Sequence, residues 1–335
     1  MRAMILTRVA SLDEQPEPLE LVDLPRPRPG PDEVLVEIAA CGVCHTELDE
    51  IEGRTAPPEL PVVPGHEIVG RVVERGDGAE RHDVGDRVGI GWIHSSDGTE
   101  GENLSAAFVA TGRDVNGGYA EYVTAPEDYA YPIPETFTDA QAAPLLCAGA
   151  IGYRSLRLTG LSDGQRLGLT GFGASGHLVL QLARHLYPKS EILVFARDAD
   201  ARLFARELGA AWTGETEARA PEPLDAIIDT TPAWRPVVEA LANLAPGGRL
   251  VINAIRKEAG DQDYLRNLVY HEHLWMEREI KSVANITGRD IREFLPIAAE
   301  IPIAPTVETY PLDQANRALR ELRAGGNRGA KVLLP

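Results

Sequence analysis

Two cysteines and one histidine, spread over a hundred residues, predict a metal site that only a fold joining three distant segments can build. They stand in the words Cys41-Gly-Val-Cys-His-Thr46, Gly65-His-Glu67 and Pro144-Leu-Leu-Cys-Ala-Gly149. Two thiolates and an imidazole are ligands that suit Zn²⁺. A structural zinc is closed by a fourth protein ligand, whereas three leave one position open for chemistry. We therefore expect Cys44, His66 and Cys147 to hold one catalytic zinc.

A glycine-rich word, Gly171-Phe-Gly-Ala-Ser-Gly176, has the GxGxxG spacing of a dinucleotide-binding turn. It lies between a strand predicted over 166–170 and a helix predicted over 177–186. Gly171 permits a tight turn, Gly173 lets the backbone approach a pyrophosphate, and Gly176 lets the helix pack closely. The expected phosphate-binding residues are Gly171, Gly173, Ala174, Ser175 and Gly176. A nicotinamide cofactor beside zinc predicts hydride transfer on an alcohol or carbonyl group.

The pattern of the chain changes near residue 164. Before it, segments such as 33–38 and 68–73 alternate β-branched and polar residues between Gly, Pro and Asp turns. After it, strands alternate with helices, which indicates a parallel sheet of the Rossmann kind. The later strands are expected at 166–170, 192–195, 226–229, 249–253 and 281–284, and a second helix at 203–208. The predicted domains are 1–148, 149–284, and 285–335 as a return to the first.

Composition excludes several classes of protein. A net charge of −18 opposes binding to nucleic acid and to anionic membranes, because both need a basic surface. No apolar run is long enough to cross a bilayer, and no secretory signal is evident. Three cysteines are too few for a disulfide framework, and they fit a cytoplasmic location. Cys41 and Cys44 have the spacing of a redox pair, but no thioredoxin-like strand and helix surround them.

The metal-ligand motifs and the glycine turn, together with Tyr131-Pro-Ile-Pro134 and Lys281-Ser-Val-Ala-Asn285, are spread over essentially the whole chain. In them the chain resembles the zinc-dependent alcohol dehydrogenases of the medium-chain dehydrogenase/reductase superfamily, within the cinnamyl-alcohol-dehydrogenase-like bacterial branch. The resemblance implies an α/β protein with a GroES-like β-rich catalytic domain and a Rossmann doubly wound parallel-sheet cofactor domain. It also implies an active site in the cleft between the two domains.

The resemblance assigns roles to individual residues. Cys44, His66 and Cys147 match the catalytic zinc ligands, and Glu67 matches an acidic residue close to the metal. Thr46 matches the hydroxyl residue that binds the substrate oxygen and starts a proton relay. The remaining assignments are Asp49 at the end of the relay, His45 near the cofactor pyrophosphate, and Trp92 in the substrate pocket. We expect Tyr119 and Ile286 to line the same pocket and, with Trp92, to set its width.

Three positions depart from the pattern of this family. The stretch 96–105 has no cysteine where relatives often carry a second zinc on a four-cysteine lobe, so we expect no structural zinc. Glu47 stands where the family usually has aspartate. Asp49 replaces the histidine that often ends the relay, although a carboxylate can accept a proton or the ribose hydroxyls can pass it directly to water.

The choice between the two nicotinamide cofactors depends on the word Phe195-Ala-Arg-Asp198. An acidic side chain after the second strand binds the ribose hydroxyls of NAD(H). Asp198 in that position would select NAD(H), whereas Arg197 would suit the 2′-phosphate of NADP(H). We favour NADP(H).

The sequence thus predicts a zinc-dependent alcohol dehydrogenase that acts as an aldehyde reductase, on a medium-chain or aromatic primary alcohol and its aldehyde. One alternative is a zinc-independent quinone or enone reductase of the same superfamily, which retention of three metal ligands disfavours. Another is a non-catalytic nucleotide-binding protein on the same fold. The expected partners are small-molecule substrates and a second copy of the chain, with a tetramer also open.

Overall fold

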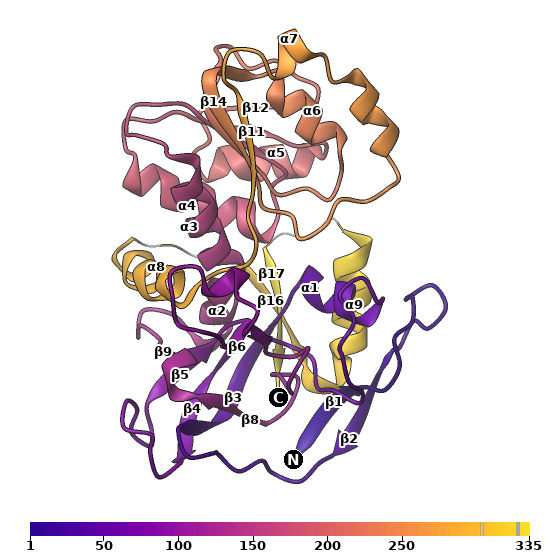
Figure 1. Cartoon of the computed structure of the whole chain (residues 1–335), viewed down its shortest axis with the longest axis vertical. Coiled ribbons are helices and arrows are strands. Elements are labelled where there is room, and N and C mark those ends of the chain that lie inside the picture. The colour runs from indigo at the N-terminus through magenta and orange to yellow at the C-terminus, as the bar shows by residue number, and fades with distance from the viewer. Residues whose placement is uncertain (302, 304, 326–328) are drawn as a thin grey trace. The chain divides into compact units, whose positions relative to one another are not determined.

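The computed structural model describes residues 1–301, 303, 305–325 and 329–335 (Figure 1). Its chain forms two compact units. The first unit comprises residues 1–150 and 286–335, and the second comprises residues 151–285. Within the described ranges, none of the helices has both the length and the apolar composition that crossing a bilayer would require.

The first unit is mainly β-structure (Figure 1). Its strands are β1 (Arg2–Leu6), β2 (Leu19–Asp23), β3 (Glu33–Val43), β4 (Ile68–Arg75), β5 (Arg87–Ile90), β6 (Ile93–Ser95), β7 (Val109–Ala110), β8 (Tyr122–Pro126), β9 (Ala130–Pro132), β16 (Val307–Pro311) and β17 (Ala330–Leu334). Its helices are α1 (His45–Ile51), α2 (Asp139–Ala142), α8 (Gly288–Glu300) and α9 (Ala315–Ala324), and its 3-10 turns are η1 (Glu102–Leu104), η2 (Glu127–Tyr129), η3 (Ala143–Leu146) and η5 (Leu312–Gln314). Helix α3 (Ala148–Thr159) continues into the second unit.

A seven-stranded sheet organises this unit, with β3 near its centre. The strand order is β16-β17-β3-β4-β5-β9, and β8 also pairs with β3. Val34, Val36 and Ile38 of β3 are buried, and because alternate side chains of a strand point to the same face, they mark the face of β3 that packs into the core. The resulting core extends to Leu319 on α9, so the C-terminal segment packs against the same sheet.

The pairing of β3 with β4 brings two sequence motifs together. The strands are antiparallel, and Cys41 lies opposite Ile68. The amide of Gly42 donates to the carbonyl of Glu67 at 2.9 Å, which extends the ladder past the start of β4. The end of β3 therefore lies beside the residues that precede β4, although some twenty-five positions separate them in sequence.

The second unit holds a parallel six-stranded sheet. Its strands are β10 (Leu167–Thr170), β11 (Ile192–Phe195), β12 (Trp212–Gly214), β13 (Leu224–Asp229), β14 (Leu244–Ile252) and β15 (Glu279–Ser282). Its other elements are α4 (Ala174–Leu186), α5 (Ala199–Glu207), α6 (Arg235–Leu241), α7 (Tyr270–His273) and the 3-10 turn η4 (Gln262–Asn267). The order β12-β11-β10-β13-β14-β15 is that of a dinucleotide-binding Rossmann sheet, which confirms the predicted fold class.

Two elements of this unit differ in extent from the prediction. Helix α5 begins at Ala199, not near Leu203, because the Asp198 side chain accepts a hydrogen bond from the Asp200 amide and caps the helix. Strand β15 ends at Ser282, two residues before the expected end at 284. Strand β12 was not predicted, because its three residues are too few to show a periodic pattern.

Candidate active site

Four potential metal ligands converge in the first unit. One ligand atom from each of Cys44, His66, Glu67 and Cys147 lies within 4.8 Å of the other three. The two sulfur atoms are 3.9 Å apart. A tetrahedral zinc with Zn–S bonds of about 2.3 Å places two thiolates about 3.8 Å apart. The donor types and the sulfur separation therefore both fit Zn²⁺.

Local structure explains how each ligand reaches this point. Cys44 is the N-cap of α1 and follows directly on β3, while His66 and Glu67 directly precede β4. Cys147 stands between η3 and α3. The apolar turn η3 is buried against β5, where a Cβ on Gly89 would lie 2.7 Å from Leu146. A glycine at position 89 thus lets η3 approach closely enough to present Cys147.

Glu47 orients the histidine of this cluster. Its Oε1 atom lies 2.5 Å from Nδ1 of His66, and its Oε2 accepts from the Cys44 amide at 2.7 Å. Both side chains are buried, at 0% and 1% exposure. An imidazole held at Nδ1 by a carboxylate presents Nε2 to a metal in a fixed orientation. The replacement of the usual aspartate by Glu47 therefore preserves a carboxylate behind the histidine.

The surroundings of the two thiols shift their pKa values in opposite directions. A hydrogen bond from Cys147, together with the nearby His66 imidazole, lowers the pKa of Cys44 well below its usual range despite burial. The same thiol contact and burial raise the pKa of Cys147. Burial opposes the charged form of His66, but the Glu47 carboxylate and Cys44 outweigh it and raise the histidine pKa. Burial, reinforced by Cys44, raises the pKa of Glu67.

Gly42 provides the space that Glu67 occupies. A Cβ at this position would lie 1.8 Å from Oε2 of Glu67, closer than any real contact. Glu67 is only 3% exposed, so its carboxylate is enclosed between the backbone of β3 and the metal ligands. The residue expected beside the metal is therefore one of the four converging groups.

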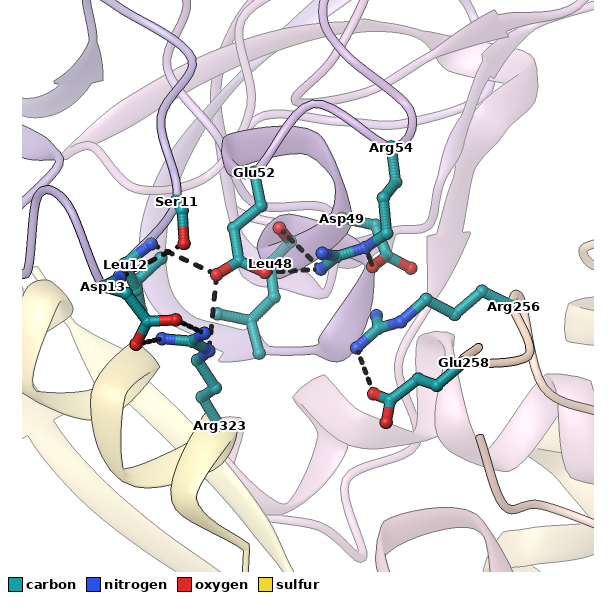
Figure 2. A network of polar contacts seen from close by, with 10 residues as sticks. All are labelled: Ser11, Leu12, Asp13, Leu48, Asp49, Glu52, Arg54, Arg256, Glu258 and Arg323. Atoms are coloured by element: carbon teal, nitrogen blue, oxygen red, sulfur yellow. Dashed lines mark hydrogen bonds and ion pairs between the residues drawn. The ribbon is translucent and has the colours of Figure 1, made fainter. Parts of the chain in front are cut away.

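The two residues expected in the proton relay have different surroundings. Thr46 is buried, and its Oγ1 lies 3.6 Å from the Cys44 sulfur. Asp49 is also buried, but its carboxylate accepts a hydrogen bond from Nε of Arg54. Figure 2 shows Arg54 between Asp49 and Glu52, and Arg54 forms an ion pair with Glu52 as well. No sequence motif indicated that Arg54 would bind Asp49, the proposed end of the relay.

The three aromatic and aliphatic residues expected in the substrate pocket lie at different depths. The Trp92 ring is centred 6.0 Å from the His66 ring. Tyr119 is fully buried, and a Cβ on Gly65 would meet its ring at 2.4 Å. Ile286 is 2% exposed. Trp92 thus lies beside one of the candidate metal ligands.

The glycine turn of the second unit has the expected backbone. Gly171 has a φ of +80°, and a Cβ there would lie 2.8 Å from Oγ1 of Thr230. A Cβ on Gly176 would lie 3.0 Å from the Gly171 carbonyl, so the helix packs tightly on the turn. At Gly173, a Cβ would meet no described atom within 4 Å. Helix α4 starts at Ala174, followed by Ser175, so the turn fits a bound pyrophosphate.

The two candidate ribose-binding residues differ in what their side chains do. Asp198 uses its side chain to cap α5, whereas Arg197 is exposed. His45, expected near the pyrophosphate, is the exposed first residue of α1 in the first unit.

One buried acidic residue near the metal ligands escaped the sequence analysis. Glu50 is 1% exposed, and neither carboxylate oxygen has a hydrogen-bond partner among the described residues. Its spacing of four residues from Thr46 was the available signal, since such pairs share one face of a helix. An acidic residue in a short helix is ordinarily taken as solvated, which concealed it.

Comparison with known proteins places the chain in a family. Residues 30–135 match the alcohol dehydrogenase GroES-like domain. The "Probable alcohol dehydrogenase AdhA" of Mycobacterium tuberculosis is 45% identical over 95% of this chain and 93% of its own length. An alcohol dehydrogenase of Geobacillus stearothermophilus is 33% identical over 97% and 98%. The solved cinnamyl alcohol dehydrogenase of Sorghum bicolor has a TM-score of 0.84 and 26% identity, and the match covers 98% of this chain and 97% of that one. The chain therefore belongs to the zinc-dependent alcohol dehydrogenases of the medium-chain dehydrogenase/reductase superfamily and is an NAD(P)-dependent oxidoreductase that acts on alcohols.

Proposed function

We propose that the first unit is the catalytic domain, where Cys44, His66 and Cys147 hold one zinc, and that the second unit is the cofactor domain. The observation that carries the proposal is the convergence of two sulfurs, a histidine nitrogen and a carboxylate within 4.8 Å. The physiological reaction is the reduction of an aldehyde, and its reverse is the oxidation of a medium-chain or aromatic primary alcohol.

The residues around the ligands supply positioning and a route for the proton. When bound, zinc supplies a Lewis acid that makes the substrate hydroxyl more acidic, and the nicotinamide supplies the hydride acceptor. Glu47 fixes the His66 ring through Nδ1. Thr46 holds the substrate oxygen, because a hydroxyl can accept a hydrogen bond and donate one at the same time. Asp49 is the proposed end of the relay, and Arg54 holds its carboxylate in place. Glu67 adds a negative charge close to the ligands when it is ionised.

Metal dependence tests the proposal directly. We expect alcohol-dependent reduction of NAD(P)⁺ that EDTA or phenanthroline abolishes and zinc restores. Chelator-insensitive reduction of an enone or quinone would instead support the zinc-independent branch of the superfamily. Cofactor binding without turnover of any substrate would support a non-catalytic nucleotide-binding protein.

The absence of cysteine from residues 96–105 supports a single zinc per chain. The purified protein should contain one equivalent of tightly bound zinc by elemental analysis. A second equivalent would contradict the proposal that this chain lacks the structural site.

We further propose that NADP(H) is the preferred cofactor. Asp198 is engaged in capping α5, while Arg197 is exposed one residue earlier, where its guanidinium can bind a 2′-phosphate. Replacing Arg197 with Ala should raise the KM for NADPH much more than the KM for NADH. Equal effects on the two KM values would refute this preference.

The other partners follow from charge and surface. A net charge of −18 supports a small-molecule enzyme without nucleic-acid or membrane partners. All three cysteines are free, and free thiols are typical of reducing compartments. This supports a cytoplasmic location. An exposed sheet edge at β15 supports a homodimer, from which a tetramer can also be assembled.

A further inference from the structure

Glu50 is a buried carboxyl group for which the reaction described above has no use. Its side chain is 1% exposed, and neither oxygen has a hydrogen-bond partner among the described residues. Buried polar groups in native proteins are nearly always satisfied, because removing them from water without a partner is costly. A buried carboxyl without a protein partner therefore has its hydrogen-bonding capacity available to an ordered water or to a bound ligand.

The helix places Glu50 on the side of the candidate metal centre. Thr46 and Glu50 are four residues apart on α1, so their side chains lie on the same face of the helix. Glu47 contacts His66, and Thr46 contacts the sulfur of Cys44. By contrast, Leu48 and Ile51 belong to the hydrophobic core. Glu50 therefore shares the face of α1 from which Thr46 reaches the Cys44 sulfur, while Leu48 and Ile51 anchor the helix in the core.

The groups that act on the Glu50 charge are those of the same site. Besides burial, they are Glu47, His66, Arg113 and Cys44, and burial is the largest cause of a raised Glu50 pKa. Arg113 forms two hydrogen bonds of 2.8 Å with Asp114, and it does not donate to either oxygen of Glu50.

Arg113 connects Glu50 to the aromatic side of the site. The Arg113 guanidinium lies 5.8 Å from the centre of the Trp92 ring, which in turn is 6.0 Å from the His66 ring. The indole Nε1 of Trp92 is also buried without a partner among the described residues. The surroundings of His66 thus combine an aromatic ring with at least two polar groups able to bind a ligand, and they are not purely apolar.

We propose that Glu50 accepts a hydrogen bond from a second polar group of the substrate, a hydroxyl or a protonated amine. The proposal rests on the proposed function, in which Thr46 holds the reacting oxygen. The Cβ atoms of residues four apart on a helix are about 5–6 Å apart. A chain of three or four carbons between the reacting oxygen and the second group spans this distance. The preferred substrates are therefore primary alcohols of that length with a terminal donor group.

Three substrates of nearly equal size test the proposal: butane-1,4-diol, 4-aminobutan-1-ol and pentan-1-ol, in which a methyl group replaces the donor. Zinc-loaded wild-type enzyme should show a higher kcat/KM for at least one of the first two than for pentan-1-ol. Glu50→Leu should lower kcat/KM for that substrate about 10- to 100-fold and leave pentan-1-ol unchanged or improved. The ratio isolates recognition, because a merely structural effect would change all three substrates alike.

Two further variants identify the donor and control for the helix. Glu50→Gln keeps an acceptor oxygen but loses the charge, so it should retain selection of the diol and lose selection of the amino alcohol. Glu52→Gln removes another carboxylate at the end of α1, one that binds Arg54 and the Leu12 amide, and should leave all ratios unchanged. Parallel changes for all three substrates in Glu50→Leu and Glu50→Gln would overturn the inference. Absence of turnover of every alcohol by the wild type would instead overturn the proposed function.

Discussion

Glu47 links two parts of the candidate metal centre through one carboxylate. One oxygen lies 2.5 Å from His66 Nδ1 and the other accepts from the Cys44 amide at 2.7 Å. Carboxylates behind a metal-binding histidine typically contribute a factor of about 10 to 100 in metal affinity. We expect Glu47→Ala to weaken zinc binding by that factor, and Glu47→Gln to weaken it less, because its amide oxygen can still accept from the imidazole.

Competition with a chromogenic chelator measures the zinc affinity of these variants. Glu52→Gln provides the control, since Glu52 lies at the end of the same helix and binds Arg54, not a candidate ligand. An affinity of Glu47→Ala equal to that of the wild type would show that the His66 contact does not support metal binding.

At the residue scale, sequence motifs indicated the side chains that converge in the candidate metal centre but not all of their neighbours. Cys44, His66 and Cys147 were predicted as ligands because their side-chain chemistry and the motifs around them are distinctive. Asp49 was predicted as the end of the relay from its position in a motif. Its partner Arg54 lies beyond the end of α1, and a linear motif does not show a contact that forms when the chain turns there. Glu50 was missed because burial of a carboxylate is decided by the packing of the whole helix.

At the scale of elements, a buried carboxylate holds the cysteine-free segment 96–105 against α8. Glu102 of η1 is 3% exposed; its Oε1 accepts from the Gly288 amide at the start of α8, and its Oε2 accepts from the Tyr129 hydroxyl at 2.9 Å. Burial and this bond raise the pKa of Tyr129 to about 12. Glu102→Ala should destabilise the unit by about 2–3 kcal/mol, because it leaves two buried donors unpaired.

Thermal unfolding and hydrogen exchange at the Gly288 amide measure this effect. Glu100→Ala is the matched control, because the Glu100 side chain is 85% exposed and its bond to Arg289 lies at the surface. An unchanged Tm and unchanged protection of Gly288 in Glu102→Ala would contradict the role of Glu102 as a fastening between η1 and α8.

A second polar cluster joins α9 to β16 and β17 and predicts a pH dependence. Hydrogen bonds from Tyr310, Arg317 and Lys331 lower the pKa of Glu321 from 4.5 to about 2. Because the folded pKa is depressed, the cluster stabilises the fold above pH 4.5, and this stabilisation is lost as the pH falls toward 2. The Tm difference between wild type and Glu321→Gln should therefore be largest above pH 4.5 and shrink below it.

A series of Tm measurements from pH 6 downward tests this prediction. Glu14→Gln is the control, since the Glu14 side chain is exposed, and its difference from wild type should stay small and flat. A difference for Glu321→Gln that does not shrink with falling pH would assign the stability of the cluster to packing and not to the charge.

The fold was easier to predict from sequence in the second unit than in the first. Strands such as β10 and β11 are short apolar runs followed by helices, and that alternation by itself implies parallel pairing. In the first unit, β17 pairs with β3 across nearly the whole length of the chain, and Leu333 lies opposite Cys41. Periodicity gives the existence of a strand but not its partner, so the sequence alone did not reveal this sheet order.

At the scale of the whole molecule, the outer edge of the Rossmann sheet predicts how copies assemble. Strand β15 ends the sheet, all four of its residues are exposed, and within the described residues no strand pairs with its outer edge. Large apolar side chains are exposed on β15 and the segment before it, namely Val269, Tyr270, Trp275, Met276 and Ile280. An open edge beside exposed apolar groups favours pairing with a second copy across a twofold axis.

Replacing Ile280, which is 46% exposed, with Asp should weaken self-association at least about 10-fold, since the charge would be buried between two edges. Sedimentation velocity over a range of concentrations measures the change. A dimeric wild type should become monomeric, and a tetrameric one should become dimeric. Leu203→Asp, on α5 and 51% exposed, introduces the same charge at another surface of the unit and should leave association unchanged. If both variants sediment like the wild type, the edge of β15 does not form the interface, and the subunits must meet through another surface.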